Sequence, residues 1–228
     1  MPIEEIAYTQ KQLIAKANLA AKPVITATQM LESMTNSRLP TRAEATDVAN
    51  AILDGTDCVM LSGESAMGTY PEEAVTMLAK IASFTESHRS STSLSAHREF
   101  VQQHPPMTGA DRMASLIEHA LLTIPIDAIL VPTHTGTTGR IISRCKPQVW
   151  AIAPSRDHAA CQGLAFSYGV YPVERTDESD EDWRSFAAEW LDRLGISGQR
   201  VMLVAGPSTR NPNANHRIEL IRLDKKAK

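Results

Sequence analysis

The chain has 228 residues, a formal net charge of −3 and a pI near 6.2, so it lacks the basic excess that binding to nucleic acid or to an anionic membrane surface requires. No run approaches the ~18 apolar residues of a membrane span, and the first residues lack the basic-then-apolar order of a signal peptide, which predicts a cytoplasmic protein. The cysteines are far apart and lack metal-ligand spacing, which indicates buried free thiols: Cys58, Cys145 and Cys161.

Residues 1–87 are predicted to alternate helices with short strands. A helix fits residues 3–20, where Ile6, Leu13 and Ala17 share one stripe between charged residues. The apolar runs 24–27 and 58–61 are β-rich and too short for helices. They predict strands of a parallel sheet, buried on both faces.

Two further helices in this part have clear start signals. Thr41 and Glu44 have the spacing of a capping box, and Gly55 is suited to end the helix that they begin. Pro71 is suited to the first turn of a helix over residues 72–84. The side chains predicted to face inward from this helix are Val75, Leu78 and Ile81.

Residues 88–109 are predicted to be a linker, because they are rich in Ser, Thr, His and Gln and contain Pro105-Pro106. Residues 110–228 then alternate again, which predicts a separate three-layer α/β/α domain with a mostly parallel sheet. Its expected helices are 110–123, 139–144, 158–166 and 181–194. Its expected strands are 128–131, 149–153, 170–173, 201–205 and 218–223.

Four linked motifs in the first part resemble pyruvate kinase. They are Lys22-Pro23-Val24-Ile25-Thr26-Ala27-Thr28-Gln29-Met30, Pro40-Thr41-Arg42-Ala43-Glu44, Asp47-Val48-Ala49-Asn50-Ala51 and Leu61-Ser62-Gly63-Glu64-Ser65. The second part is similar more loosely, through Val131-Pro132-Thr133-His134-Thr135-Gly136-Thr137-Thr138, Gly169-Val170-Tyr171-Pro172-Val173 and Val204-Ala205-Gly206. The resemblance implies that residues 1–87 are the last part of a (β/α)8 barrel and that residues 110–228 are the family's C-terminal domain.

The family transfers the phosphoryl group of phosphoenolpyruvate to ADP and protonates the enolate to give pyruvate, a step of glycolysis. In its pattern Thr28 helps to relay that proton, and Ser62 and Glu64 belong to the same hydrogen-bonded neighbourhood. Thr28 and Ser62 follow their apolar runs, where reactive groups lie in such barrels. The alternative interpretations are a strand-end threonine bonded to nearby backbone and an ordinary Ser-Gly turn.

Arg42 is either a solvated residue of a helix first turn or, as the resemblance suggests, part of a subunit contact in a homotetramer or other homo-oligomer. The loop at residues 133–138 leaves a strand and enters a helix, where anions are favoured. The resemblance implies that it holds the phosphate of a sugar-phosphate allosteric effector through Thr133, Thr135, Gly136, Thr137 and Thr138. Its alternative is a threonine-capped turn. His134 provides no permanent cation, and residues 207–215 lack the glycines typical of the family's effector loop.

The resemblance also implies Mg2+ and K+, but it assigns their ligands and the phosphoryl lysine to segments before Met1, so we expect no metal site and no activity in this chain alone. Two strands cannot close a barrel, so residues 1–85 alone should fold poorly or recruit a partner such as the missing N-terminal half. A truncated gene model, a split enzyme and a non-catalytic relative all fit. The alternative function is a regulatory or assembly module that binds a phosphorylated metabolite.

Overall fold

A computed structural model describes residues 2–89, 109–175, 182–206 and 217–223. The chain divides into two compact units, Met1–Pro105 and Pro106–Lys228. Most of the predicted 88–109 linker lies outside the described residues, so the domain limits 1–87 and 110–228 stay predictions. None of the helices in the described part combines the length and hydrophobicity that a membrane crossing requires.

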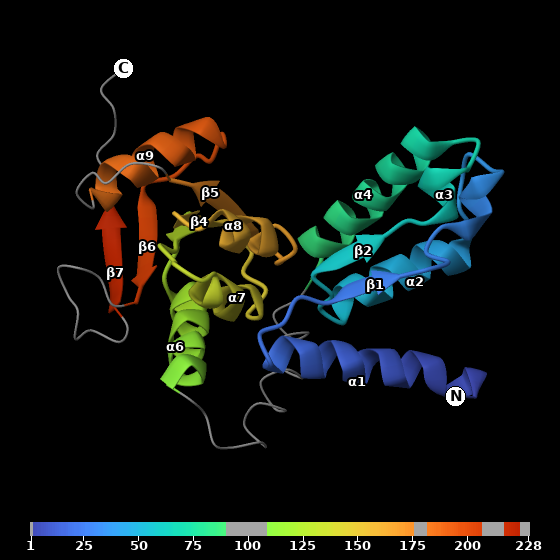
Figure 1. Ribbon diagram of the computed structural model, residues 1–228, viewed down its shortest axis with the longest axis horizontal. Helices are drawn as coiled ribbons and strands as arrows, with labels where there is room; N and C mark the ends of the chain where they lie inside the picture. Colours follow the sequence, from blue (N-terminus) through green and yellow to red (C-terminus); the bar gives the residue numbers. More distant parts are fainter. Residues whose placement is uncertain (1, 90–108, 176–181, 207–216, 224–228) are drawn as a thin grey trace. The chain divides into compact units, whose positions relative to one another are not determined.

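The described residues of the first unit form two parallel strands and the helices around them (Figure 1). Strands β1 (Ile25–Ala27) and β2 (Cys58–Met60) pair in register, with Ile25 opposite Cys58. The other elements, in chain order, are η1 (Ile3–Glu5), α1 (Ile6–Leu19), η2 (Glu32–Thr35), α2 (Arg42–Leu53), α3 (Gly63–Ala66) and α4 (Pro71–Ser87). The short helices η2 and α3 were not predicted.

The predicted helix signals of this unit are confirmed. Thr41 is the N-cap of α2 and forms a complete capping box with Glu44. Gly55 follows the end of α2 with a φ of 94°, in the left-handed region that glycine tolerates. Pro71 is the first residue of α4, where its missing N–H costs no helical hydrogen bond.

Helices α2 and α4 pack with β2 around the core of the first unit, but several burial predictions here are wrong. Ile25 and Met60 are 45% and 43% exposed, because no third strand among the described residues pairs with β1 or β2. Val75 is 54% exposed, and its neighbour Ala74 is buried instead. The buried residues of this core are Met30, Leu31, Met34, Val48, Ala51, Ile52 and Ala74.

The buried face of helix α1 also differs from the apolar stripe that the sequence predicted. Ile6 and Leu13 are exposed, whereas Ile14 and Asn18 are buried. The side-chain amide of Asn18 donates a 2.9 Å hydrogen bond to the carbonyl of Gly55. This bond ties α1 to the end of α2, so the buried face of α1 includes a polar residue that hydrophobic periodicity does not identify.

The described residues of the second unit form a five-stranded sheet in the order β5-β4-β3-β6-β7, and among these pairings only that of β7 is antiparallel. The predicted mostly parallel sheet is therefore confirmed. The strands are β3 (Ala128–Leu130), β4 (Ala151–Ser155), β5 (Val170–Glu174), β6 (Arg200–Ala205) and β7 (Arg217–Arg222). The helices are α6 (Gly109–Thr123), α7 (Thr137–Ser143), α8 (His158–Leu164) and α9 (Trp183–Arg193).

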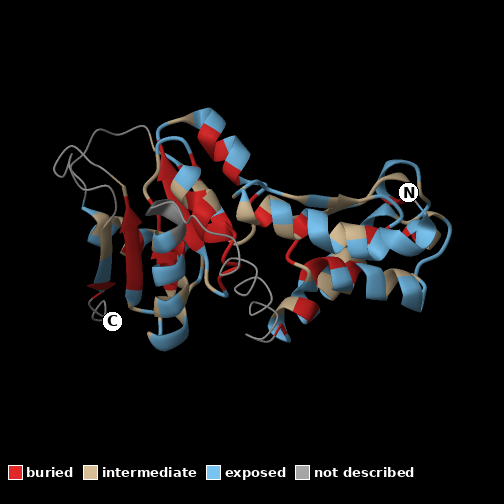
Figure 2. Cartoon of the chain, turned by 90° about the horizontal axis from the view of Figure 1, so that it is seen from below, coloured by how far each residue is buried: buried red, intermediate tan, exposed pale blue. Residues whose placement is uncertain are grey.

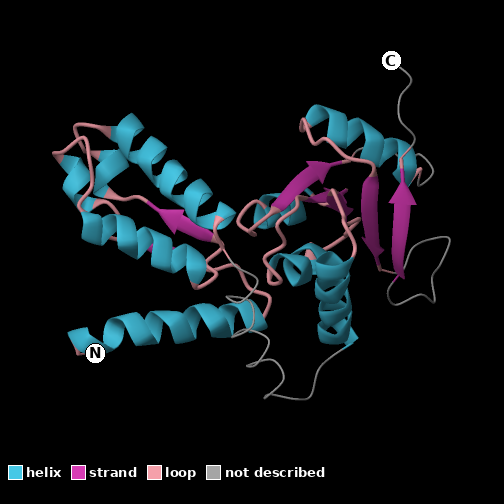
Figure 3. Cartoon of the chain, turned by 180° about the vertical axis from the view of Figure 1, so that it is seen from behind, coloured by secondary structure: helices cyan, strands magenta, loops and turns pink. Residues whose placement is uncertain are grey.

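Helices cover both faces of this sheet, as Figure 3 shows. Helix α9 packs on one face through Ala187 and Leu191. Helices α6, α7 and α8 pack on the other through Ile117, Ile142 and Leu164. The central strands are correspondingly the most buried part of the unit (Figure 2). Strand β4 lies two residues later than its predicted range of 149–153, and α7 begins at Thr137 rather than at residue 139.

Pro172 lies within β5, one of the two edge strands of this sheet. The N–H of Arg175 donates to the carbonyl of Ser155 in β4, so the odd-numbered residues of β5 direct their N–H groups inward. The nitrogen of Pro172 therefore faces the outer edge, where it interrupts no hydrogen bond of the sheet.

All three cysteines are free thiols, as predicted. Cys145 and Cys161 are buried, whereas Cys58 is only half-buried. Burial raises the pKa of the Cys145 thiol to about 12, so this group stays protonated and unreactive at neutral pH.

Candidate functional site

Thr28 and Ser62 lie at the carboxyl ends of the two strands of the first unit. Thr28 directly follows β1, and Ser62 follows β2 by two residues. Because β1 and β2 are parallel and in register, the two residues leave the sheet at the same edge. This is the edge at which a (β/α)8 barrel carries its reactive groups.

Glu64 joins the loops that carry these two residues. Its Oε1 accepts a hydrogen bond from the backbone N–H of Leu31 at 3.0 Å, and its Oε2 accepts one from the N–H of Ser62 at 2.7 Å. The residue is fully buried, with 0% of its surface exposed. The structure thus places Thr28 and Ser62 at one edge of the sheet, and it gives Glu64 the position of a brace between the loops that follow the two strands.

The charge state of Glu64 follows from these contacts. Burial alone would raise the pKa of its carboxyl group. Hydrogen bonds from the N–H groups of Glu64 itself, Leu31 and Ser62 outweigh burial and hold the pKa below its usual range. Glu64 is therefore ionised at neutral pH and has no proton to donate. Its geometry is that of a residue that positions its neighbours.

The backbone at Thr28 has an uncommon conformation. Thr28 and Gln29 have φ angles of 68° and 54°, in the left-handed region that β-branched residues rarely adopt. The side chain of Thr28 is exposed, and the structure gives its hydroxyl no hydrogen bond to any other described residue. Among the described residues, the Thr28 hydroxyl therefore makes no hydrogen bond to nearby backbone, which was the alternative interpretation of this threonine. The hydroxyl is open to a ligand.

A second carboxylate, Glu44, holds the same loop further along. Besides its capping contacts with Thr41, it accepts hydrogen bonds from the N–H and hydroxyl of Ser33 at 2.7 and 2.6 Å. Burial would raise the pKa of Glu44, but the bonds from Ser33 and Thr41 lower it. The sequence indicated the capping box but gave no sign of the contact with Ser33, because that contact is not part of the local motif.

Arg42 is exposed in the first turn of α2. It does not belong to the cluster of Thr28, Ser62 and Glu64. Its exposure agrees with both predicted interpretations, a solvated residue and a subunit contact.

In the second unit, the loop from Thr133 to Thr138 connects β3 to α7 as predicted. Gly136 is buried at the N-cap of α7 with a φ of 78°, and its N–H donates to the Thr133 hydroxyl at 3.1 Å. The hydroxyls of Thr135 and Thr137 lie 2.9 Å apart. Thr138 is half-buried in the first turn. The loop therefore gathers hydroxyl groups around a left-handed glycine.

Arg140 gives this loop the permanent cation that its sequence did not suggest. Its guanidinium group donates to the carbonyl of Thr135 at 3.1 Å and to the hydroxyl of Thr137 at 3.4 Å. Arg140 is four residues beyond Gly136, so one helical turn returns its side chain to the loop. The other predicted effector segment, residues 207–215, lies outside the described residues.

The described residues do not form a carboxylate cluster of the kind that would hold Mg2+. No group of three or more His, Cys, Asp or Glu side chains among them is arranged to hold a metal ion. The buried carboxylate near Thr28 already uses both oxygens for backbone N–H groups. We therefore assign no chemical step to an ion held by this part of the chain.

Comparison with known proteins matches both units to one family. Residues 1–75 match the model of the pyruvate kinase barrel domain, and residues 111–217 match that of the pyruvate kinase alpha/beta domain. Pyruvate kinase from Thermococcus litoralis is 57% identical over 184 residues, covering 79% of this chain and 39% of the relative. Pyruvate kinase from Dictyostelium discoideum is 39% identical over 226 residues, covering 96% and 44%.

The crystal structure of a pyruvate kinase from Cryptosporidium parvum superposes with a TM-score of 0.86 at 32% sequence identity, covering 98% of this chain and 44% of that one. The chain thus spans less than half the length of these relatives. The two matched models together include most of its residues, and both belong to the same enzyme. The chain therefore belongs to the pyruvate kinase family.

Proposed function

We propose that this chain contributes the Thr28–Ser62 edge of a pyruvate kinase active site, which transfers the phosphoryl group of phosphoenolpyruvate to ADP and yields pyruvate. One observation carries the proposal. An exposed Thr28 hydroxyl with a left-handed backbone stands at the carboxyl end of β1, beside a loop from β2 that Glu64 braces. Unusual backbone conformations of this kind concentrate at functional sites.

Each residue has a distinct role in this proposal. Thr28 stands at the methylene carbon of the enolate and takes part in delivering the proton. Ser62 contributes a hydroxyl from the neighbouring strand end. Glu64 is ionised, and among the described residues its carboxylate accepts hydrogen bonds from backbone N–H groups, so in this proposal it positions the loops of Thr28 and Ser62 and does not supply the proton.

The remaining parts of the reaction follow from the family and are proposed with it. Mg2+ and K+ are held by groups other than the described residues of this chain, and the family pattern assigns them to earlier barrel strands. The complete enzyme is a cytoplasmic homo-oligomer, a tetramer in the family pattern, in which Arg42 makes a subunit contact. Arg42 is exposed at the start of α2, as such a contact requires.

A coupled assay with phosphoenolpyruvate, ADP, Mg2+ and K+ tests the proposal. The chain alone should give no turnover. Addition of the preceding barrel segments of a related pyruvate kinase, by fusion or in trans, should restore it. Failure of Thr28→Val to lower the restored turnover would contradict the proposed role of this edge.

We also propose that the loop at residues 133–138 binds the phosphate of a sugar-phosphate effector. Two features support this role. The loop offers a cation, the Arg140 guanidinium group, and hydroxyl donors from Thr135 and Thr137. These groups lie beside Gly136, where no side chain blocks the approach of a ligand to the backbone. This function does not need Thr28. If the loop binds a sugar phosphate while the completed enzyme stays inactive, a regulatory module is the better description of the chain.

A further inference from the structure

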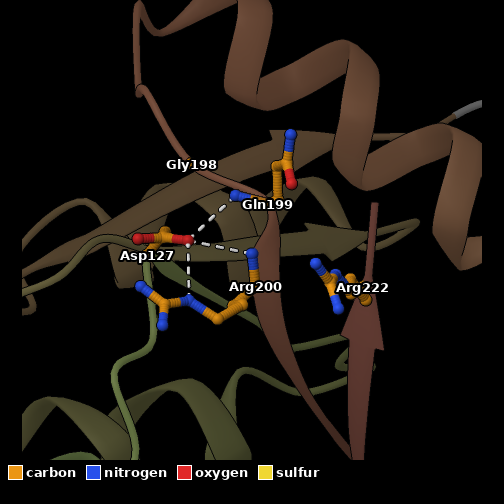
Figure 4. Close-up of a pocket in the computed structure, with 5 residues that line it drawn as sticks. All are labelled: Asp127, Gly198, Gln199, Arg200 and Arg222. Atoms are coloured by element: carbon orange, nitrogen blue, oxygen red, sulfur yellow. Dashed lines mark hydrogen bonds and ion pairs between the residues drawn. The ribbon is translucent and has the colours of Figure 1, made fainter. Parts of the chain in front are cut away.

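Three charged residues form a row across one end of the sheet of the second unit, on the strands β3, β6 and β7. The N–H of Asp127, the residue before β3, donates to the carbonyl of Arg200 at the start of β6. Arg200 is in turn directly opposite Arg222 in the antiparallel pair of β6 and β7. Figure 4 shows the row, which lies at the end of β3 opposite to the loop at residues 133–138.

The register places the two arginines at directly opposite positions of the antiparallel pair. The N–H of Leu223 donates to the carbonyl of Gln199 at 2.7 Å, so these two residues form a hydrogen-bonded pair. Arg200 and Arg222 therefore form the adjacent non-hydrogen-bonded pair, in which opposed side chains approach most closely. Like charges directly opposite each other destabilise a sheet, so this pair needs a compensating negative charge.

Asp127 compensates only one of these arginines. Its Oδ2 accepts 2.9 Å hydrogen bonds from the N–H groups of Gln199 and Arg200 and lies 3.6 Å from Nε of Arg200. Burial would raise the pKa of Asp127, but the bonds from Arg200 and Gln199 lower it, so the carboxylate is charged. The structure gives the guanidinium group of Arg222 no acidic partner among the described residues.

The row lines a hollow of about 460 Å³ whose walls are Asp127, Gly198, Gln199, Arg200 and Arg222. Gly198 is required there, since a Cβ at this position would lie 2.3 Å from the Cβ of Asp127. The close approach of this backbone holds the Asp127 carboxylate against the N–H groups of β6. The carboxylate is thereby kept at one end of the row and away from Arg222.

We propose that this hollow binds a small oxyanion of the phosphate-monoester class between the guanidinium groups of Arg200 and Arg222. A phosphate group accepts from both planar guanidinium forks and removes the repulsion of the opposed pair. The uncommitted oxygen of Asp127 accepts from a hydroxyl group of the ligand. The proposal is independent of the active site and of the loop at residues 133–138.

Titration of the full chain with inorganic phosphate and with glycerol 3-phosphate, at constant ionic strength against chloride, tests the proposal by amide NMR. Saturable shifts are expected at Gln199, Arg200 and Leu223. Arg222→Gln should weaken the binding that these amides report by about tenfold or more, because it removes one charge-assisted contact. The matched control Arg193→Gln removes an equal charge from α9 in the same unit and should bind as the parent does.

Thermal unfolding gives a second readout that does not depend on the shifts. Without phosphate, Arg222→Glu should unfold at a higher temperature than the parent, because it places a carboxylate opposite Arg200. With phosphate, the parent should gain more stability than Arg222→Glu does, because the variant keeps only the loop at residues 133–138 as a phosphate site. Three outcomes would overturn the proposal: shifts confined to residues 133–139, equal affinity in Arg222→Gln, or no saturation in the millimolar range.

Discussion

The carboxylate of Glu64 accepts a hydrogen bond from the backbone N–H of Leu31, a residue 33 positions earlier in the chain. Its second oxygen accepts from Ser62, so one side chain fixes the loops after both β1 and β2. Leu31 is fully buried in the core between η2, α2 and α4, which anchors the far end of this contact. The left-handed residues Thr28 and Gln29 lie between β1 and this anchor, so Glu64 limits the conformations open to Thr28.

Glu64→Gln should therefore destabilise the first unit more than the loss of one exposed carboxylate would. The substitution replaces one acceptor oxygen by an NH2 group that faces a backbone N–H, and a buried donor without a partner costs about 1–3 kcal/mol. Hydrogen exchange should accelerate at Leu31 and Ser62. Glu4→Gln, at an exposed carboxylate of η1, is the control and should leave exchange unchanged. Unaltered exchange at Leu31 in Glu64→Gln would contradict the bracing role.

Stability of this unit should fall in acid. The pKa values of Glu44 and Glu64 are lowered in the folded state from a reference value of 4.5. Groups with lowered folded-state pKa values stabilise the fold above their unfolded pKa, and this contribution is lost as pH falls through 4.5 toward the folded values. Unfolding midpoints measured from neutral pH down to acid should decline there. The decline should be shallower in Glu64→Gln, and an equal slope would argue against a lowered pKa.

Thr28→Val should act on the chemical step in a completed enzyme. A positioned proton-transfer group contributes on the order of a hundredfold or more in rate, whereas a lost ground-state hydrogen bond contributes nearer 1 kcal/mol. We expect a large fall in kcat with little change in KM, together with slower exchange of the pyruvate methyl protons with solvent. Thr26→Val, in β1, is a control for the loss of a threonine hydroxyl two residues away. Normal methyl exchange in Thr28→Val would remove Thr28 from the catalytic residues.

Gly136→Ala should disrupt the loop at residues 133–138. The new Cβ would lie 2.8 Å from an Arg140 guanidinium nitrogen, and the φ of 78° strains any L side chain. A loss of about 1–2 kcal/mol and weaker phosphate binding at this loop are expected. The paired variant Gly163→Ala, in α8, has no atom within 4 Å of the new Cβ and should stabilise by about 0.5–1 kcal/mol. Similar effects of the two variants would argue against a special conformation at Gly136.

Residues 110–228 should fold without the rest of the chain, whereas residues 1–85 should not. The sheet of the second unit is covered by helices on both faces. Ile25 and Met60 of the first unit, in contrast, remain close to half exposed on β1 and β2. Limited proteolysis should leave a resistant fragment that begins near residue 109. An equally resistant fragment from the first unit would contradict this expectation.

The sequence predicted best those elements whose signals are local. The Thr41–Glu44 box, Gly55 and Pro71 act on backbone groups within one turn, and the structure places helix ends at all of them. The three cysteines were correctly predicted to be free for a similar reason, since their spacing alone disfavours a shared site.

Contacts between distant segments could not be predicted in this way. The antiparallel direction of β7 depends on how the chain returns to β6, which the apolar pattern of residues 218–223 does not encode. Val75 was predicted to be buried because helical periodicity identifies an apolar stripe on α4. It does not identify the element against which the helix packs, and Val75 is exposed. Arg140 and the bond between Glu44 and Ser33 were missed because each joins a motif to a residue outside it.

Pro172 has a consequence for how the second unit behaves at high concentration. An edge strand normally presents a row of free N–H groups that can pair with a strand of another molecule. On the outer side of β5 that row is interrupted at Pro172, which has no N–H to offer. A fibril-like stack cannot continue through such a gap without losing a hydrogen bond at every copy. Pro172→Val would close the gap, and the isolated domain should then aggregate more readily on heating.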